Sequence, residues 1–568
     1  MINQWFAKVG WHNAVMRVAL STFVLLVWDS IALAQAPKLD ADVLQAMQQL
    51  SIDSIRQHLN VLAHDSLQGR ATGTPGSEKA IRYLALHLKK YGIEPAHRGS
   101  SYFQNIPLHG AIPQPESELA LHAGDTTIPL QLWQDYILYN TGAQTFSPTP
   151  IQMVFVGYGI FAPEYDYNDY YDLDVTNKVV VFFSGEPGSD DPDYFDGKKP
   201  SRYADPVMKH RIALSRGARG SIMIPLPRER IYLDWDYWRD QFAFEEVRLP
   251  YNVADNLNVL LRYEQAQHLF RGASHDLESV LEFERVGAMR SFPLAVEVTF
   301  RGQFKERDFV ARNVVGIVQG SDHLLRDEFV LLSAHFDHLG VGAAVKGDSI
   351  YNGVVDNAIG AAAVLEMARV FAAMPKQPRR SMLFLFADAE EKGLLGSRFY
   401  CDQPLVPLYK TIAAVNVDGL AIMDTFDSIN SVGPEYSTLG EHLQTVATAL
   451  DLFVDNVPSV FREIEFFHRS DQFSFAQAGI PAILIMEGHE YRNLPSGAGV
   501  RRFIMWGREI YHTPFDDLNQ DINFAATLQH AQFIFAFTGT LANTFVPPQW
   551  KPGTVFSNAR LQSIAEKR

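Results

Sequence analysis

Histidine and carboxylate residues follow several apolar runs in the second half of this chain. The run FVLLSA leads directly to His335, a glycine-rich loop then reaches Asp356, and two later runs lead to Glu390 and Asp418. Imidazole and carboxylate groups suit zinc, and more than three carboxylates indicate more than one ion. The pattern therefore predicts a site for divalent cations. The residues concerned are His335, Asp337, His338, Asp356, Glu390, Glu391, Asp418 and His512.

Glu390 and Glu391 are adjacent, so their side chains point in different directions at a strand end. One of them can bind a metal ion while the other stays unbound as a general base. That base would take a proton from a water molecule whose pKa a bound cation has already lowered. A glutamate pair is more often a solvated loop charge, but this pair follows an apolar run, as the other potential ligands do. The position favours the catalytic interpretation.

Asp337 and His338 follow the first histidine closely, and we expect them to differ in role. Asp337 is placed to hold the second ring nitrogen of His335, as outer partners of metal-binding imidazoles usually do. His338 is interpreted as a packed or loop histidine. The metallo-β-lactamase motif His-x-His-x-Asp-His fails here because Ser333 stands at its first position. The sequence also contains neither a Gly-x-Ser-x-Gly elbow nor a Cys-x-x-Cys pair.

The elements that must position these residues alternate between helix and strand. Continuous apolar strands suit a parallel sheet that is covered on both faces, where ligands collect at the carboxyl ends of the strands. We therefore predict an α/β fold whose mixed, mostly parallel sheet has helices on both faces. Strands are expected at 329–334, 382–388, 412–418 and 481–486, helices at 77–91, 357–374, 437–452 and 523–545, and a loose tail at 551–568.

The length of 568 residues is too great for one ordinary core, so two domains are expected. After residue 128 the sequence changes to short strands and turns, such as IQMVFV and KVVVFF. We predict a β-rich module at 129–290, inserted into a domain that is formed by residues 35–128 and 291–568. The aromatic segment 225–252 of this module is equally compatible with a lid and with a loop packed on its own module.

Residues 1–34 have the layout of a secretory signal peptide. Lys8 and Arg17 precede an apolar core, and small residues up to Ala34 provide a cleavage site. The apolar core is shorter than the ~20 residues of a membrane-spanning helix, which favours cleavage over an uncleaved anchor. We therefore expect a periplasmic or secreted protein without stable membrane insertion.

Composition limits the classes of partner. With 47% hydrophobic and 20% charged residues, the chain is globular rather than disordered. The net charge of -16 disfavours nucleic acid and anionic membrane surfaces, because binding either requires a basic patch. Cys401 is the single cysteine, so no internal disulfide can form and stability must come from the core.

Together, these motifs resemble the co-catalytic zinc exopeptidases, a family that includes secreted bacterial leucyl aminopeptidases and glutamate carboxypeptidase. The matching blocks occur in the family's order: SAHFDHLG, NGVVDNAIGAAAVLEMAR, FLFADAEEKGLLGSRFY, NVDG, RSDQFSFAQAGIPAIL and YHTPFDD. The blocks FVGYGIFAPEYDYNDYYDLDV and KHRIALSRGARGSIMI resemble the protease-associated domain that some members insert. The resemblance implies the zinc exopeptidase fold with such an insert at 129–290.

The resemblance also implies roles for individual residues. It predicts two zinc ions that share Asp356, with Glu390 as the general base. It further implies a cis peptide bond between Asp356 and Asn357. The remaining ligands by position are His335 and Asp418 for one ion, and Glu391 and His512 for the other.

The implied function is that of an exported zinc aminopeptidase acting on peptides. A carboxypeptidase or dipeptidase of the same family is the alternative, and it needs a basic residue for the substrate's terminal carboxylate. Glutaminyl cyclases share the fold but are expected to use one zinc ion, and an inactive binding homologue need not keep its ligands. The complete ligand set disfavours both. The basic candidates are Arg462, Arg469, Arg492, Arg501, Arg502 and Arg508.

Overall fold

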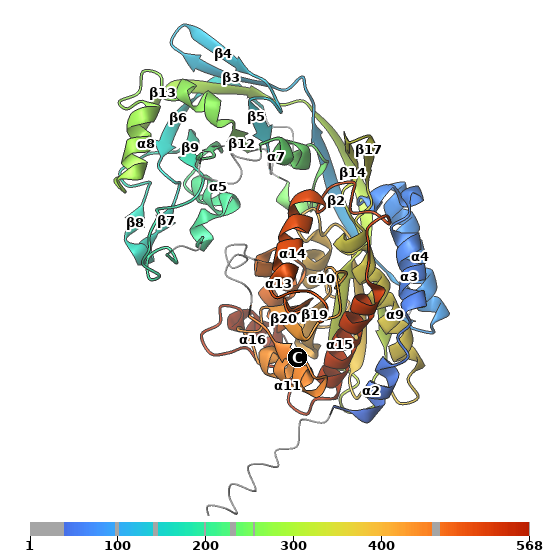
Figure 1. Cartoon of the computed structure of the whole chain (residues 1–568). Helices are drawn as coiled ribbons and strands as arrows, with labels where there is room; N and C mark the ends of the chain where they lie inside the picture. The colour runs from blue at the N-terminus through green and yellow to red at the C-terminus, as the bar shows by residue number, and fades with distance from the viewer. Residues whose placement is uncertain are drawn as a thin grey trace, which may run out of the picture.

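The computed structural model describes most of the chain after the predicted signal peptide 1–34, which lies outside the described residues. These residues form two lobes, each built around its own large β-sheet (Figure 1). No helix among them is long and apolar enough to cross a membrane. The described ranges are 39–96, 101–139, 146–197, 200–227, 235–253, 256–456 and 466–566.

The first lobe contains a ten-stranded mixed sheet whose four central strands are parallel. The carboxyl ends of parallel strands meet at one edge of a sheet, and His335 is the last residue of the second of these strands. This edge is where the ligands were predicted to collect. In spatial order the strands are β18 (Ser381–Ala387), β15 (Phe329–His335), β19 (Thr411–Asn416) and β22 (Ala482–Glu487).

The outer strands of this sheet pair mainly antiparallel, so the sheet is mixed as predicted and its parallel part lies at the centre. β14 pairs antiparallel with β18 and with β2, and β20 pairs antiparallel with β22. The outer strands are β1 (Glu94–Pro95), β2 (Phe103–Pro113), β11 (Glu246–Arg248), β14 (Phe304–Val318), β20 (Ser428–Val432) and β21 (Phe453–Val454).

Helices cover both faces of the sheet because its strands are apolar on both sides. Val330 and Leu332 of β15 belong to one core, whereas Leu331 belongs to the other. The first core is closed by α2 (Ala41–Met47), α3 (Ile52–Leu62), α4 (Pro75–Lys90), α9 (Ile359–Ala373), α11 (Leu439–Ala449) and α15 (Phe524–Asn543), the second by α10 (Leu395–Asp402) and α13 (Gln472–Gln477).

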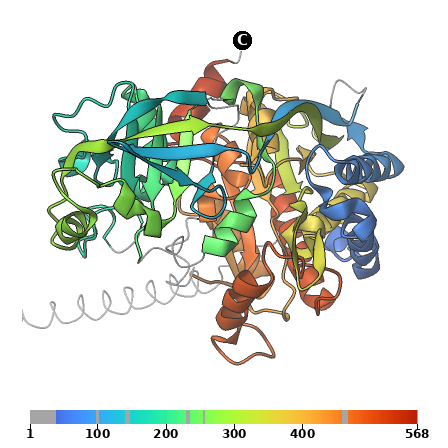
Figure 2. The same cartoon turned by 90° about the horizontal axis from the view of Figure 1, so that it is seen from above.

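The second lobe contains an eight-stranded sheet in the order β4-β3-β13-β6-β9-β10-β12-β5. Strands β2 and β14 of the first lobe lead toward it (Figure 2). Its strands are β3 (Glu118–Ala123), β4 (Thr126–Leu130), β5 (Tyr136–Leu138), β6 (Phe146–Val156), β9 (Val179–Phe183), β10 (Gly220–Ile224), β12 (Leu257–Leu261) and β13 (Ser291–Arg301). Its helices are α5 (Pro206–Ser215), α7 (Trp235–Phe242) and α8 (Leu277–Arg285).

The limits of this second sheet differ from the predicted limits of the inserted module. β3 precedes residue 129 and β13 follows residue 290, yet both pair within the second sheet. The sheet therefore extends from Glu118 to Arg301. Both strands have the alternating burial of strands in general, so their sequences do not show which sheet they join.

The aromatic segment 225–252, of which residues 228–234 lie outside the described part, is not confined to its own lobe. β11 pairs antiparallel with β2 at the end of the first lobe's sheet. The Phe244 ring packs edge-on against Tyr351, with 5.2 Å between ring centroids. Residues 241–252 thus contact the first lobe near the strand ends, which a loop packed only on its own module would not do.

The predicted loose tail 551–568 is wrong in its described part. It forms α16 (Ser557–Ala565), and Phe556 is buried in the second core of the first lobe. Arg560 donates hydrogen bonds to the carbonyl oxygens of Leu408 and Thr411. The tail is rich in polar residues, so its sequence did not indicate that Phe556 and Arg560 attach it to the first lobe.

Candidate metal centre

His335 faces two aspartates at the carboxyl edge of the central strands. Its Nε2 lies 3.3 Å from Oδ1 of Asp356 and 3.2 Å from Oδ1 of Asp418. Asp356 belongs to the loop Val354–Ala358 that leads into α9, and Asp418 follows β19. Three groups from separate elements therefore converge on one point.

His512 and Glu391 form a second set around the same aspartate. Nε2 of His512 lies 3.2 Å from Oδ2 of Asp356 and 3.2 Å from Oε2 of Glu391. Asp356 thus faces one imidazole with each of its two carboxylate oxygens. A residue shared by two cations requires this arrangement.

The donor set fits zinc. Nε2 of His512 is buried and has no hydrogen-bond partner among the described residues, although two carboxylate oxygens lie close to it. A ring nitrogen aimed at carboxylates in this way is suited to a cation held between them. The clusters whose ligand atoms lie within 4.8 Å of one another are His335, Glu390 and Asp418, and His338, Asp356 and Glu391.

Carboxylates outnumber imidazoles in the cluster, and the pKa values shift accordingly. Burial would lower the pKa of His512, but Glu391 and Asp356 raise it to about 10. Burial would raise the pKa of Asp356, but the neighbouring imidazoles of His335 and His512 hold it well below its usual range. A field that attracts protons also attracts divalent cations, so protons and metal ions compete for these imidazoles.

Glu390 and Glu391 lie in different surroundings, as their adjacency predicted. Oε2 of Glu390 is 4.0 Å from Nε2 of His335, whereas Glu391 is in direct contact with two imidazoles. Burial raises the pKa of Glu390 well above its usual value, His335 opposes this shift and Asp418 adds to it. A carboxyl group with a raised pKa that lies farther from the imidazoles is suited to accept and return a proton.

Asp337 is buried beside His335, whose second ring nitrogen it was predicted to hold. Nδ1 of His335 is 3.2 Å from the main-chain oxygen of Asp337 and 3.8 Å from its Oδ1. The carboxylate accepts the amide hydrogens of Glu390 and Glu391, at 3.0 and 3.3 Å. These buried amides need an acceptor, so Asp337 positions the main chain of the glutamate pair.

His338 is fully buried, in agreement with a packed histidine, yet it also lies at the centre. Its Nδ1 is 2.6 Å from Oε1 of Glu391. Its contact with a predicted ligand was not expected from the sequence. The ring orients Glu391, whose other oxygen faces His512.

A buried arginine that was not identified from the sequence holds the loops that follow His335 and precede Asp356. Arg70, at the end of the turn Asp65–Arg70, donates to the carbonyl oxygens of Phe336 and Asn352, at 2.6 Å each. It also donates to Gly353 at 2.9 Å. Burial lowers its pKa to about 10 while nearby carboxylates such as Asp337 oppose the shift, so the group stays charged. A residue so far away in the sequence gives no local signal of this role.

The loop that carries Asp356 has two further supports. The carboxylate of Asp516 accepts the amide hydrogens of Val355 and Asp356, both at 3.0 Å. The implied cis peptide bond between Asp356 and Asn357 is present, and the Asn357 side chain donates to the carbonyl oxygen of Val417 at 2.8 Å. The hydrogen bond from Asn357 links the loop to the end of the strand that precedes Asp418.

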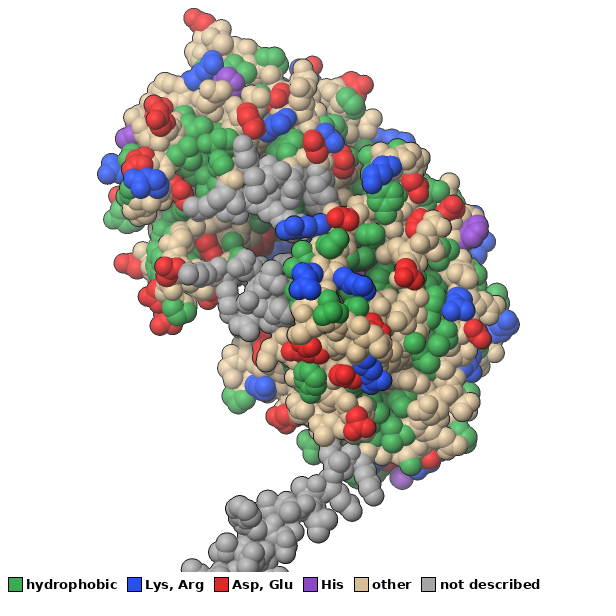
Figure 3. Space-filling model, viewed as in Figure 1, with side chains coloured by type: hydrophobic (Ala, Val, Ile, Leu, Met, Phe, Trp, Pro, Cys, Tyr) green, Lys and Arg blue, Asp and Glu red, His purple; other side chains and the backbone are tan. Residues whose placement is uncertain are grey.

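The arginines considered for a carboxypeptidase are exposed wherever the structure describes them. Arg492 pairs with Asp427 at 2.8 Å, and Arg501, Arg502 and Arg508 are exposed on α14 (Ala498–Glu509). Arg469 is exposed, and Arg462 lies outside the described residues. Acidic and basic side chains are interspersed over the face shown in Figure 3.

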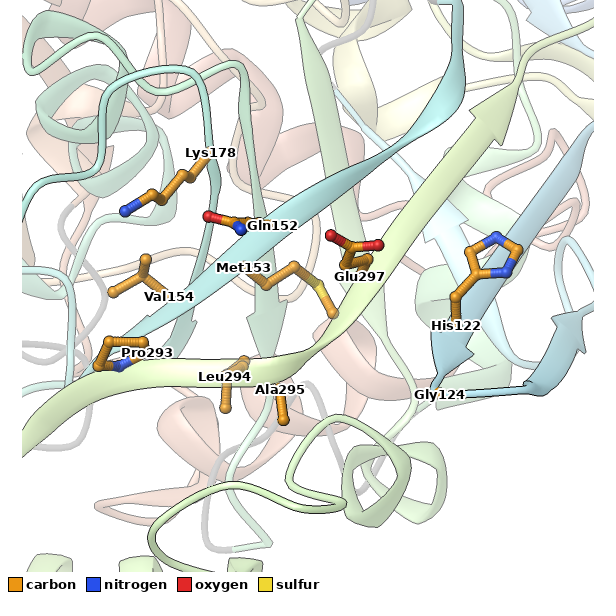
Figure 4. A pocket seen from close by; sticks show the side chains of 10 residues that line it. All are labelled: His122, Gly124, Gln152, Met153, Val154, Lys178, Pro293, Leu294, Ala295 and Glu297. Carbon is orange, nitrogen blue, oxygen red and sulfur yellow. The ribbon is translucent and has the colours of Figure 1, made fainter.

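A pocket of about 420 Å³ lies in the second lobe, away from these ligands. It is lined by β6 and β13, with polar side chains such as Gln152, Lys178 and Glu297 (Figure 4). None of the predicted site residues lines it, so it is not the predicted metal centre.

One family model and several known proteins are similar to parts of this chain. Residues 313–538 match the model of peptidase family M28. Leupeptin-inactivating enzyme 1 of Streptomyces exfoliatus is 29% identical over 229 residues, which cover 39% of this chain and 47% of that protein. Probable glutamate carboxypeptidase AMP1 of Arabidopsis thaliana is 28% identical over 264 residues, which cover 44% of this chain and 32% of that protein.

Aminopeptidase NAALADL1 of Mus musculus is 34% identical over 133 residues, which cover 22% of this chain and 16% of that protein. The chain therefore spans less than half the length of each of these three relatives. A solved aminopeptidase from Aneurinibacillus sp. strain AM-1 aligns with a TM-score of 0.53 and 18% identity, over 88% of this chain and 95% of that one. This similarity shows that the two chains share a fold, and it confirms the predicted fold class.

Proposed function

The chain carries a peptidase family M28 domain, and on this premise we propose that it is an exported two-zinc aminopeptidase that removes N-terminal residues from peptides. One observation carries the proposal. Asp356 faces His335 with one carboxylate oxygen and His512 with the other, at 3.3 and 3.2 Å. One zinc ion would be held by His335, Asp418 and Asp356, and the other by His512, Glu391 and Asp356.

The chemistry divides between the ions and the protein. When bound, zinc would supply Lewis acidity, which lowers the pKa of water and polarises a peptide carbonyl. Glu390 would accept the proton of the attacking water and return it to the departing amine, since its raised pKa suits transfer in both directions. Asp337 would keep Glu390 in place through the main-chain amide that it binds.

Two further parts of the proposal rest on the sequence. Export is supported by the signal-like layout of residues 1–34. The second lobe is proposed to be an inserted protease-associated domain. Its sheet is formed by residues that follow β2 and precede β14 in the sequence, and these two strands pair with each other in the first lobe. Peptide substrates would reach the metal centre at the edge where segment 241–252 of this lobe contacts the first.

A substrate panel tests the proposal. Aminoacyl anilides with a free amino group should be hydrolysed, N-acetylated analogues should not, and amidation of a dipeptide's C-terminus should make little difference. Chelation should abolish hydrolysis and added zinc should restore it. Cleavage that depends on a free C-terminal carboxylate would instead identify a carboxypeptidase or dipeptidase, and zinc binding without any hydrolysis would identify an inactive homologue.

A further inference from the structure

We propose that Gln241 of the second lobe is a positioning residue for the metal centre: it fixes the tautomer and the orientation of His512, so the second lobe completes a site in the first. The inference rests on the proposed function, since it concerns a ligand of the proposed zinc site. Gln241 lies near the end of α7. This helix is on the side of the second lobe that is turned toward α14 (Figure 1).

The side-chain amide of Gln241 contacts His512 at two points. Its Oε1 is 3.1 Å from Nδ1 of His512, and its Nε2 is 3.5 Å from the main-chain oxygen of the same residue. Both contacts join residues that are 271 positions apart in the chain. A two-point contact restrains the ring and the main chain of His512 together.

The pair of contacts also determines which ring nitrogen carries the proton. A main-chain oxygen can only accept a hydrogen bond, so the amide nitrogen of Gln241 must be the group that faces it. The amide oxygen then faces Nδ1, and Nδ1 must donate. In the neutral ring, the form that binds a metal ion, the lone pair is then left on Nε2, the atom that lies 3.2 Å from both Asp356 and Glu391. Gln241 thus selects the tautomer that can bind zinc.

His512 needs such a restraint. Its φ of +56° lies in the left-handed region, which residues other than glycine rarely adopt. Its ring stacks on Tyr511, with 3.8 Å between centroids and 20° between planes, and this stacking leaves the choice of tautomer open.

The segment that carries Gln241 is fastened to the first lobe. Glu245 binds Arg307 of β14 through both carboxylate oxygens, at 2.6 and 2.5 Å. β11 then joins the first sheet next to β2. These contacts lie four or more residues beyond Gln241, so they hold α7 against His512 without touching the proposed ligands.

Zinc affinity, measured by competition with a chromogenic chelator, tests the inference independently of hydrolysis. Gln241→Leu removes both hydrogen-bonding groups. It should lower the affinity for the zinc ion proposed at His512 about 10- to 100-fold, the usual effect of losing an outer partner of a ligand. Gln241→Glu keeps an acceptor for Nδ1 and should retain most of the affinity. Gln267→Leu makes the same exchange at an exposed glutamine of the second lobe and should change nothing.

The outcomes separate the inference from the function on which it rests. Unchanged zinc affinity in Gln241→Leu, or equal losses in the Leu and Glu variants, would overturn the role of Gln241. Wild-type protein that binds zinc but hydrolyses no peptide would overturn the proposed function alone. Circular dichroism should show that the Leu variant is folded, and a loss of affinity that follows unfolding would count against a positioning role.

Discussion

Glu390 and Glu391 are neighbours with different contacts, and their roles can be separated by substitution. Glu390→Gln removes a base but no metal contact, so the zinc content should stay near that of the wild type. The rate should fall by about 10²- to 10⁴-fold, mainly in kcat, as is usual when general acid-base catalysis is lost. Glu391→Gln should instead weaken zinc binding, and added zinc should restore part of the activity.

Zinc analysis and steady-state kinetics of the two variants decide between the assignments. Loss of zinc from Glu390→Gln, together with retention by Glu391→Gln, would exchange the two roles. The rest of the site would be unaffected by that exchange, because His335, Asp356 and His512 contact one another independently of Glu390.

His530 should make the protein sensitive to acid. Burial lowers its pKa to about 3, and its Nδ1 accepts the amide hydrogen of Ala421 at 3.1 Å. The folded pKa is below the unfolded value of ~6.5, so its contribution to stability is present above that value and is lost as pH falls toward 3. The loss is about 1.4 kcal/mol per pH unit in this window.

His530→Gln keeps an acceptor but does not titrate. Between pH 7 and 5 its free energy of unfolding should therefore fall by about 2 kcal/mol less than that of the wild type, as measured by urea denaturation. His323→Gln, at an exposed position, is the matched control and should follow the wild type. Parallel pH profiles for His530→Gln and the wild type would show that His530 is not the group responsible.

At the scale of elements, a short turn holds the loops that carry ligands. Arg70→Met would leave buried carbonyl oxygens without this donor, including those of Phe336 and Asn352. The free energy of unfolding should fall by about 3 to 5 kcal/mol, and zinc affinity should fall with it. Arg285→Met breaks only an exposed pair with Glu282 and should leave the free energy of unfolding nearly unchanged. Equal stability of the two variants in urea would contradict this role for Arg70.

The sequence predicted the central strands and their ligand-bearing ends because both are local signals. An apolar run followed by His335 or Asp418 can be recognised without knowledge of its neighbours. The supports of these residues could not be predicted, since Arg70, Asp516 and Gln241 reach the centre from distant segments. The tail at 551–568 was missed for a related reason: the partners of Phe556 and Arg560 lie in distant segments.

At the scale of the whole molecule, the two lobes are joined through adjacent strands. β2 and β14 pair along their length up to Pro113 and Phe304, and the chain between these residues forms most of the second lobe. The predicted limits of the inserted module, 129 and 290, differ from those of the second sheet, Glu118 and Arg301. A change in composition shows roughly where a new module begins, but it does not show which strand is the first of its sheet. Segment 241–252 crosses back to the first lobe, so the lobes are not independent at the metal centre.

The number of zinc ions that active protein binds tests the central claim most directly. Asp356 is shared between two sets of ligands, so metal analysis after zinc loading and dialysis should approach two ions per chain. Asp418→Ala should remove a ligand of one ion only, lower the zinc content toward one, and abolish hydrolysis. Active wild-type protein that settles at a single ion, together with full activity of Asp418→Ala, would contradict the two-zinc centre.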